Sequence, residues 1–134
     1  MTIDEQIILK AFSSTASINC GMYQDFLDRK NEKIPIDYFI DEYKHILEPI
    51  LKNTYGIIIF YEQIIEILNQ LYGFSYEQAK RFCKMLEIQD ILTIESYKVN
   101  VLDTRLDDLL ELIIKFSKLG IFCYKSEIEN KGNK

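Results

Sequence analysis

Apolar residues recur every three or four positions over the first thirteen residues, a spacing typical of a helix that buries one face. The residues that set this spacing are Ile7, Ile8, Ala11 and Phe12. Thr2 and Glu5 stand three positions apart, as in a capping box, and predict a helix over residues 3–13. Small and polar residues follow, and Asn19 is placed to cap a second short helix that runs to about Lys30.

The strongest helical pattern lies in the middle of the chain. Residues 37–47 carry a weaker pattern, which Pro49 interrupts. Apolar side chains then line one helical face at positions 57, 60, 61, 64, 68 and 71. Gly73 follows where a left-handed residue would end a helix, so we predict a core helix over residues 57–72.

Two further helices are predicted in the second half of the chain. Ser75 and Gln78 form a second capping box, which starts a helix that runs to about Leu86. A third clear helix ends at Gly120 and is marked by Leu106, Leu109, Leu110, Ile113, Phe116 and Ser117. Between them, residues 88–102 fit either a β-hairpin or a loose helical turn, and the apolar alternation at 97, 99 and 101 favours a short strand.

Together these patterns predict a mainly α fold, a compact helical domain of about five to six helices, with a small hairpin near 91–102 as the β alternative. The chain has 134 residues, of which 48% are hydrophobic, which suits one folded domain. We predict a single domain over residues 1–127 and a disordered polar tail over 128–134.

The charge balance argues against strong independent binding to nucleic acid. Asp and Glu number 21 against 16 Lys and Arg, which gives a net charge of −5, and phosphates are attracted only where basic residues cluster. The longest apolar runs are far too short to span a bilayer, and the first five residues are acidic where a signal peptide is basic. These features predict a cytoplasmic protein without membrane contact.

No pattern for a catalytic or metal site is found. Cys20, Cys83 and Cys123 are widely spaced and predict reduced, mostly buried thiols rather than zinc ligands. Phosphate-binding glycine loops are absent, and His45, the only histidine, has no motif around it. The acidic groups Asp107-Asp108-Glu111 and Asp25-Asp28 fit solvated helix faces. We therefore predict no catalytic residue, no metal and no cofactor.

One segment carries a more specific signal than its periodicity. Residues 47–64 read L-E-P-I-L-K-N-T-Y-G-I-I-I-F-Y-E-Q-I, with Thr54, Tyr55 and Gly56 followed by Glu62 and Gln63. This segment resembles a signature of the bacterial C-family replicative polymerases, the DNA polymerase III alpha subunits, in which the pattern is L-x-P-x-L-x-x-T-Y-G-I-x-x-Y-Q-E-Q-V-M. Phe60 stands at the tyrosine of the motif, and Tyr61 replaces its first glutamine.

The flanking segments resemble the same family in the same order. Residues 25–30 read D-F-L-D-R-K against the family's D-F-I-D-R-K, and residues 71–79 resemble its L-x-G-Y-S-x-G-E-A. Lys125 and Ser126 match its F-N-K-S-H block, in which Glu127 replaces the histidine. The resemblance covers roughly residues 5–127 and implies a stand-alone, degenerate relative of the fingers region with a little adjoining palm.

The resemblance implies a mostly helical fold and a weakened grip on nucleotide. The palm carboxylates of the family lie in a P-D-x-D-x-D motif, which this chain lacks. In place of the family's L-R-R-A-M-G-K-K run, the chain has Glu87, Ile88 and Gln89 where a glycine and two lysines stand. The loss of cations and the gain of an anion weaken attraction to a triphosphate.

These considerations predict a protein that is not an enzyme but a replication-associated binding module. Its candidate nucleotide- or DNA-binding residues are Arg29, Lys30, Arg81, Lys84 and Lys125. The alternative is a nucleotide- or DNA-binding helper subunit of a split C-family polymerase. The expected partners are a replication protein or a second copy of the chain, with weak DNA or deoxynucleotide binding besides. Self-association is suggested by tyrosines near helix starts and loops, namely Tyr23, Tyr38, Tyr43 and Tyr76.

Overall fold

A computed structural model describes residues 3–12, 21–96 and 103–132, and this part of the chain is a mainly α domain, as predicted. The α-helices are α1 (Ile3–Ala11), α3 (Met22–Lys30), α4 (Lys44–Leu51), α5 (Tyr61–Leu71), α6 (Tyr76–Ile88), α7 (Ile91–Ser96), α8 (Thr104–Lys118) and α9 (Lys125–Gly132). Two short 3₁₀ helices, η1 (Asp41–Tyr43) and η2 (Lys52–Thr54), flank α4. The described residues thus hold eight α-helices, more than the five to six predicted.

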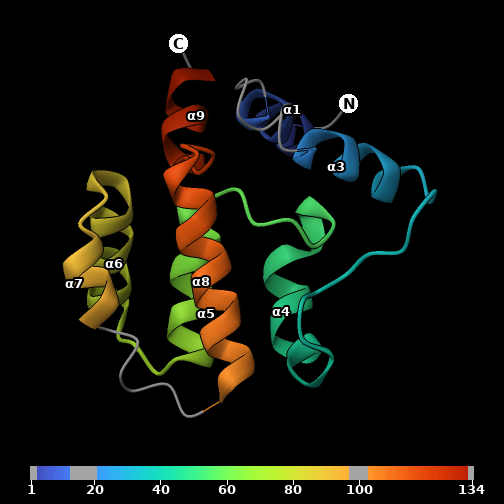
Figure 1. Ribbon diagram of the computed structural model, residues 1–134. Coiled ribbons are helices and arrows are strands. Elements are labelled where there is room, and N and C mark those ends of the chain that lie inside the picture. Colours follow the sequence, from blue (N-terminus) through green and yellow to red (C-terminus); the bar gives the residue numbers. More distant parts are fainter. Residues whose placement is uncertain (1–2, 13–20, 97–102, 133–134) are drawn as a thin grey trace.

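Helix α5 lies in the middle of the domain and packs against α4 on one side and α6 on the other (Figure 1). Helices α7 and α8 also contact α6, and α1 contacts α9. A single core runs through these elements, and its largest fully buried side chains include Phe12, Phe26, Leu47, Ile64, Leu68, Phe82 and Leu110.

The sequence pattern predicted a helix over the whole central segment 57–72, but only part of this segment is helical. Residues 57–60 are extended, and α5 begins only at Tyr61. Phe60 forms a parallel bridge with Cys123, in which the Cys123 N–H donates to the Ile59 carbonyl (3.1 Å) and the Tyr61 N–H to the Cys123 carbonyl (2.9 Å). All four residues of the segment are buried, so the apolar run reflects burial on every side, and its β-branched isoleucines suit an extended backbone.

Pro49 does not interrupt the helix before this segment, contrary to the prediction, but lies inside α4. A proline within a helix lacks the N–H that would donate to the carbonyl four residues earlier. Leu47 and Leu51 on the same helix are fully buried, and this packing offsets the missing hydrogen bond.

The predicted helix boundaries at glycine and serine are confirmed. Gly73 and Gly120 have positive φ after α5 and α8, and Ser75 caps α6 by accepting from the Gln78 N–H. Helix α3 starts later than predicted, at Met22 with Gly21 as its N-cap. The predicted caps Thr2 and Asn19 lie outside the described residues.

Residues 91–96 form helix α7, so the hairpin alternative is wrong for this half of the segment 91–102. Asp90 stabilises the start of this helix, since its carboxylate accepts from the Thr93 N–H (3.3 Å) and the Thr93 hydroxyl (2.7 Å). The alternating positions 97, 99 and 101 lie outside the described residues.

Helix α9 runs to Gly132 and so extends through most of the region 128–134 in which a disordered tail was predicted. Two contacts explain its order. The Glu62 carboxylate accepts hydrogen bonds from the first two N–H groups of the helix, and Ile128 packs against the core. In the described part of the chain, every helix is too short or too polar to cross a membrane.

Candidate functional site

Thr54 and Gln63, two residues of the polymerase-like motif, hold the extended segment 57–60 in place. The Gln63 side-chain oxygen accepts from the N–H groups of Ile59 (2.9 Å) and Phe60 (3.0 Å). Its amide nitrogen donates to the Thr54 hydroxyl (2.9 Å), which in turn donates to the Ile57 carbonyl (2.6 Å). Both side chains are buried, and their polar groups are used within the fold.

Tyr55 and Gly56 form a tight left-handed turn ahead of this segment, with φ of 54° and 85°. Arg29 reaches the turn from α3, and its Nη1 donates to the Tyr55 carbonyl (2.9 Å) and, at 3.4 Å, to that of Asp37. The Gly56 backbone lies directly against the Asp37 carbonyl, so this position has no room for a side chain. Arg29 therefore has a positioning role here that its place in a basic motif did not indicate.

Glu62 links the motif to the last helix of the domain. Its carboxylate accepts from the N–H groups of Lys125 (2.8 Å) and Ser126 (2.9 Å) at the start of α9. An acid at this place satisfies two donors that the helix leaves unpaired and interacts favourably with the helix dipole.

Four of the predicted site residues, Thr54, Glu62, Gln63 and Lys125, line one cavity of about 400 Å³ beside α5. Glu66 contributes a second carboxylate to its wall, so two acids face one lysine. A triphosphate carries several negative charges and would be repelled by this wall. The cavity is better suited to a neutral or cationic group.

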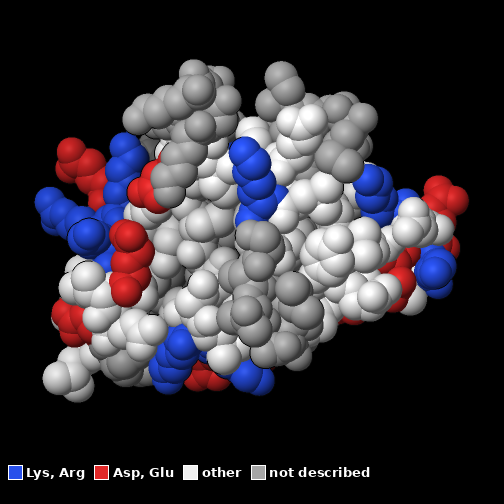
Figure 2. Space-filling model, turned by 90° about the horizontal axis from the view of Figure 1, so that it is seen from above, with Lys and Arg blue, Asp and Glu red and all other residues white. Residues whose placement is uncertain are grey.

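The five predicted basic residues are not brought together. Arg29 and Lys30 lie on α3, whereas Arg81 and Lys84 are exposed on α6 at the opposite side of the domain (Figure 1). Seen from above, Lys and Arg are scattered over the face with Asp and Glu among them (Figure 2). This view shows no continuous basic field of the kind that attracts a phosphate backbone.

The helix that resembles the triphosphate-binding region of the polymerases makes internal contacts instead. Glu87 accepts a hydrogen bond from the Tyr124 hydroxyl (3.1 Å), and Tyr124 stacks on Tyr61 with 4.6 Å between ring centroids. Burial raises the pKa of Tyr61, the first residue of α5, to about 12, and burial also raises the pKa of the Cys83 thiol, on α6, to about 12. Cys83 is therefore a buried thiol at neutral pH, as predicted, with little tendency to react.

The predicted surface tyrosines do not form one patch. Tyr38 is buried, Tyr23 and Tyr43 are half-buried, and Tyr76 is 50% exposed at the start of α6. His45 is exposed on α4. Within residues 3–12, 21–96 and 103–132, no group of three or more His, Cys, Asp or Glu is placed to hold a metal ion.

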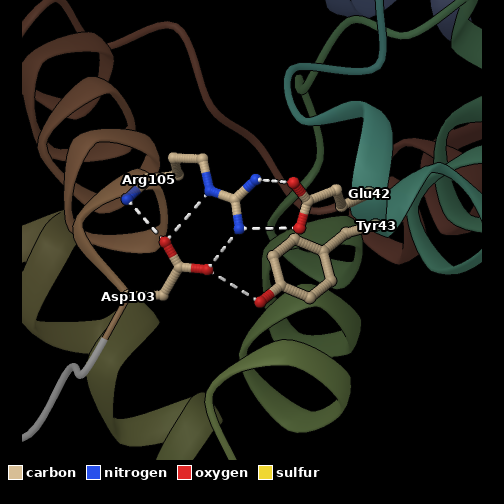
Figure 3. A network of polar contacts seen from close by, with 4 residues as sticks. All are labelled: Glu42, Tyr43, Asp103 and Arg105. Carbon is tan, nitrogen blue, oxygen red and sulfur yellow. Dashed lines mark hydrogen bonds and ion pairs between the residues drawn. The ribbon is translucent and has the colours of Figure 1, made fainter.

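Sequence reasoning missed a polar network that joins η1 to the start of α8 (Figure 3). The Arg105 guanidinium forms two bonds to Glu42 (2.5 and 2.9 Å) and two to Asp103 (2.9 and 3.1 Å). The Tyr43 hydroxyl donates to Asp103 Oδ2 (2.8 Å), the oxygen that also accepts from Arg105 Nη2. Asp103 and Arg105 precede the apolar stripe of α8, and no local sequence pattern links them to Glu42, which lies 63 residues from Arg105.

Arg105 stands at the wall of a second cavity, of about 430 Å³, which Asp41, Glu42 and Asp108 also line. Its guanidinium donors are directed to carboxylates, so it could take up a phosphate only by breaking these bonds. The network is thus a clamp between two segments of the fold rather than an anion site.

Replacing Arg105 with glutamine is expected to raise the pKa values of Asp103 and Glu42 towards their ordinary range. Hydrogen bonds from Arg105 hold the pKa of each carboxyl below that range in the folded chain. A carboxyl group whose pKa is lower in the folded chain than in the unfolded chain, where it is about 4, stabilises the fold at pH values above 4. This stabilisation is lost as the pH falls towards the lower pKa of the folded chain. The variant should therefore lose less of its melting temperature between pH 5 and pH 2 than the wild type does.

Carboxyl ¹³C NMR titration would measure both pKa values directly. The matched control is Arg81→Gln, which removes an exposed arginine from α6 and should leave Asp103 and Glu42 unchanged. Unaltered pKa values in Arg105→Gln would show that the clamp does not control these carboxyls.

Comparison with known proteins places the motif and its flanks in a larger context. The family model of the bacterial DNA polymerase III alpha subunit finger domain matches residues 1–122. DNA polymerase III alpha subunits from Campylobacter jejuni and Buchnera aphidicola are 29% and 31% identical over 126 and 127 residues, each covering 87% of this chain. The subunit from Pseudomonas aeruginosa is 30% identical over 128 residues. The chain spans about one tenth of the length of these relatives, 10% to 11%.

Proposed function

Because the chain belongs to the family of the bacterial DNA polymerase III alpha subunit finger domain, we propose that it takes part in DNA replication in the cytoplasm by binding a replication protein, without catalysing nucleotide transfer. Its relatives are DNA polymerase III alpha subunits by name, and the match to the finger domain extends over most of the chain. A fold can persist after its chemistry is lost, so the role of the chain must be argued from its own residues.

The observation that carries the proposal is how the polar groups of the motif are used. Thr54 and Gln63 are buried and hydrogen-bonded to each other and to the backbone of residues 57–60. Glu62 is hydrogen-bonded to the backbone of α9. These side chains therefore build a scaffold, and none of them needs a substrate to satisfy its hydrogen bonds.

The charges on α6 also favour binding of protein over binding of nucleotide. Where the polymerase pattern has a glycine and two lysines, this helix ends with Glu87 and Ile88 and is capped by Gln89. Ile88 is 62% exposed and uncharged, so it gives a phosphate none of the attraction that a lysine would. The three cations of this helix, Lys80, Arg81 and Lys84, are partly offset by the acids Glu77 and Glu87, although a triphosphate carries several negative charges.

The purified chain is expected to give no extension of a primed template in the presence of deoxynucleotides and Mg²⁺. It should also show a shift in melting temperature below about 1 °C with 5 mM deoxynucleoside triphosphate. A ligand at a hundredfold excess over its Kd stabilises a protein by about 2.7 kcal/mol, which would raise the melting temperature of a domain this size by several degrees. Template extension would refute the non-catalytic role, and a large triphosphate-dependent shift would favour the helper subunit of a split polymerase.

The binding role itself is tested by affinity capture from replicating cells with the tagged chain, followed by identification of the captured proteins. Enrichment of a replication protein that also binds the purified chain directly is the expected result. Capture that is abolished by nuclease treatment would mean that DNA, not protein, is the partner.

A further inference from the structure

The chain between α3 and η1 contains an exposed segment with two isoleucines. Residues 31–37 are all exposed, and residues 35–38 contain no helix, turn or bend. The segment leaves the end of α3 at the margin of the molecule and runs back towards α4 (Figure 1). Ile34 is 37% exposed and Ile36 is 40% exposed, although folded proteins mostly bury isoleucine. Both side chains can therefore still gain contacts with another molecule.

The backbone of this segment uses only one of its two edges within the domain. The Lys33 N–H donates to the Asp28 carbonyl (2.8 Å), and the Asp37 carbonyl accepts from Arg29 Nη1 (3.4 Å). In an extended chain, the N–H and C=O groups of every second residue point to the same edge. Positions 33, 35 and 37 therefore belong to the inner edge, which faces α3, and the two isoleucines belong to the outer edge.

The outer edge carries hydrogen-bonding groups without partners. In the part of the chain that the structure describes, no hydrogen bond reaches the N–H or C=O of Ile34 or Ile36. Pro35, which has no N–H, lies between them and belongs to the inner edge, so it does not interrupt the outer one. An exposed edge of this kind can pair with another strand.

The sequence of this edge is complementary to itself when two copies run antiparallel. A two-fold axis through Pro35 places Lys33 of each copy opposite Asp37 of the other. The same axis places Ile34 opposite Ile36. Opposite charges and apolar side chains that face each other across two strands stabilise the pair, so both matches favour association.

The hydrogen bonds of such a pair fall on the groups that the single chain leaves free. Opposite residues in antiparallel strands alternate between pairs that exchange two hydrogen bonds and pairs that exchange none. Proline cannot donate, so the Pro35 pair is of the second kind, and by alternation so is the pair of Lys33 with Asp37. The pairs of Ile34 with Ile36 then exchange the hydrogen bonds. The inner-edge bonds of Lys33 and Asp37 stay intact.

We propose that the chain forms a two-fold symmetric dimer in which residues 33–37 of two copies pair as antiparallel strands. The isoleucines of both copies pack on one face, and Lys33 and Asp37 form ion pairs on the other. The Lys33 ammonium has no ion pair among the described residues, and one Asp37 carboxylate oxygen accepts from the Phe39 N–H, which leaves the other for the lysine. The dimer goes beyond the proposed function, because it needs no second kind of protein.

A second copy fits this edge better than an unrelated strand or a nucleic acid does. Any strand can pair with the free backbone groups, but only one with lysine and aspartate at the matching positions satisfies both charges. Glu32 and Asp37 outnumber Lys33 in residues 31–37, and this net negative charge disfavours contact with phosphates.

The test is sedimentation equilibrium of the full-length chain with a reducing agent, which excludes disulfide-linked dimers. Two short strands make an interface in the size class of weak, transient contacts, so we expect a dimer Kd on the order of 100 μM. Between about 20 μM and about 1 mM, the average mass should rise from that of one chain towards that of two. The ¹H–¹⁵N signals of Ile34 and Ile36 should shift over the same range, since their N–H groups gain acceptors.

Two charge reversals test the register of the pair. Lys33→Asp and Asp37→Lys each place like charges opposite one another at both ends of the pair, so each variant alone should associate at least about tenfold more weakly. An equimolar mixture should recover association to within about threefold, because every lysine then faces an aspartate again. This recovery also shows that both variants are folded. The matched control is Lys80→Asp, which makes the same charge change at an exposed position of α6 and should dimerise as the wild type does.

Four results would each overturn the proposal. They are a chain that stays monomeric at about 1 mM, a Lys33→Asp variant that dimerises like the wild type, a mixture that does not associate, and Ile34 and Ile36 signals that move only when DNA or a captured replication protein is added. The last result would assign the edge to another molecule. Primer extension and affinity capture do not depend on dimerisation, so the proposed function and the dimer can fail separately.

Discussion

Gly56→Ala is expected to lower the free energy of unfolding by about 3 kcal/mol. Of this loss, roughly 1–2 kcal/mol comes from placing an alanine in the left-handed conformation and roughly 1–3 kcal/mol from a steric clash. A Cβ at this position would lie 2.5 Å from the Asp37 carbonyl oxygen and 2.9 Å from Arg29 Nη1. Since the first of these atoms is backbone and the second is bonded to the Tyr55 carbonyl, neither can move without disturbing the turn. Urea unfolding at constant pH measures the change.

The matched control for this substitution is Gly73→Ala. Gly73 also has a positive φ, of 72°, but no heavy atom lies within 4 Å of the Cβ that alanine would add. Gly73→Ala should therefore lower the free energy of unfolding only by the conformational contribution, about 1 kcal/mol. Equal losses in the two variants would mean that the close approach at Gly56 contributes nothing to stability.

Gln63→Leu is expected to lower the free energy of unfolding by about 3 kcal/mol, because it leaves two buried backbone N–H groups without their acceptor and removes the donor to the Thr54 hydroxyl. Leucine is close to glutamine in size, so the loss is due to unmade hydrogen bonds rather than to a cavity. Hydrogen exchange at Ile59 and Phe60 should speed up more than at residues of α6, since these two N–H groups lose their acceptor directly.

Gln78→Leu tests whether any glutamine near a helix start would behave in this way. Gln78 occupies the same third position of α6, where its side chain accepts from the Ser75 N–H, but it is exposed and water can replace it. Gln78→Leu should therefore lower the free energy of unfolding by about 1 kcal/mol or less. A second comparison, Thr54→Val combined with Gln63→Leu, should cost less than the sum of the single changes, because the two side chains are bonded to each other. Strict additivity would contradict a shared network.

The helices that the sequence predicts well are those in which local pattern and capping agree. Helix α6 combines the Ser75 and Gln78 capping box with a buried face, and α8 has an unbroken apolar stripe that ends before Gly120. Both signals act within a few residues, so they can be recognised without knowledge of the fold. The same is true of the left-handed glycine after α5.

The errors arise where distant residues decide the local structure. Residues 57–60 mimic a helical stripe, but their backbone is paired with Cys123 and Gln63, and only the fold brings Cys123 alongside. The start of α9 is stabilised by Glu62, which is more than sixty residues away. Neither partner can be found from spacing or composition.

The sequence indicated only part of the candidate site, because contacts between distant residues also decide how that site is built. Resemblance to a polymerase signature named Thr54, Glu62 and Gln63, and in the structure these three line one cavity with Lys125. It gave no indication that their polar groups serve the fold itself. The basic residues were chosen by their charge and their place in the matched segments, and neither reveals that α3 and α6 lie on opposite sides of the domain.

The pairing of residues 59–62 with residues 123–126 has a consequence for synthesis of the chain on the ribosome. Four consecutive apolar residues, from Ile57 to Phe60, emerge long before the segment that pairs with their backbone has been translated. Throughout that interval they are a short β-prone stretch with an unpaired edge, the kind of sequence that associates between nascent chains. Safe folding of this stretch therefore depends on how quickly residues 123–126 follow, or on a chaperone that shields it until then.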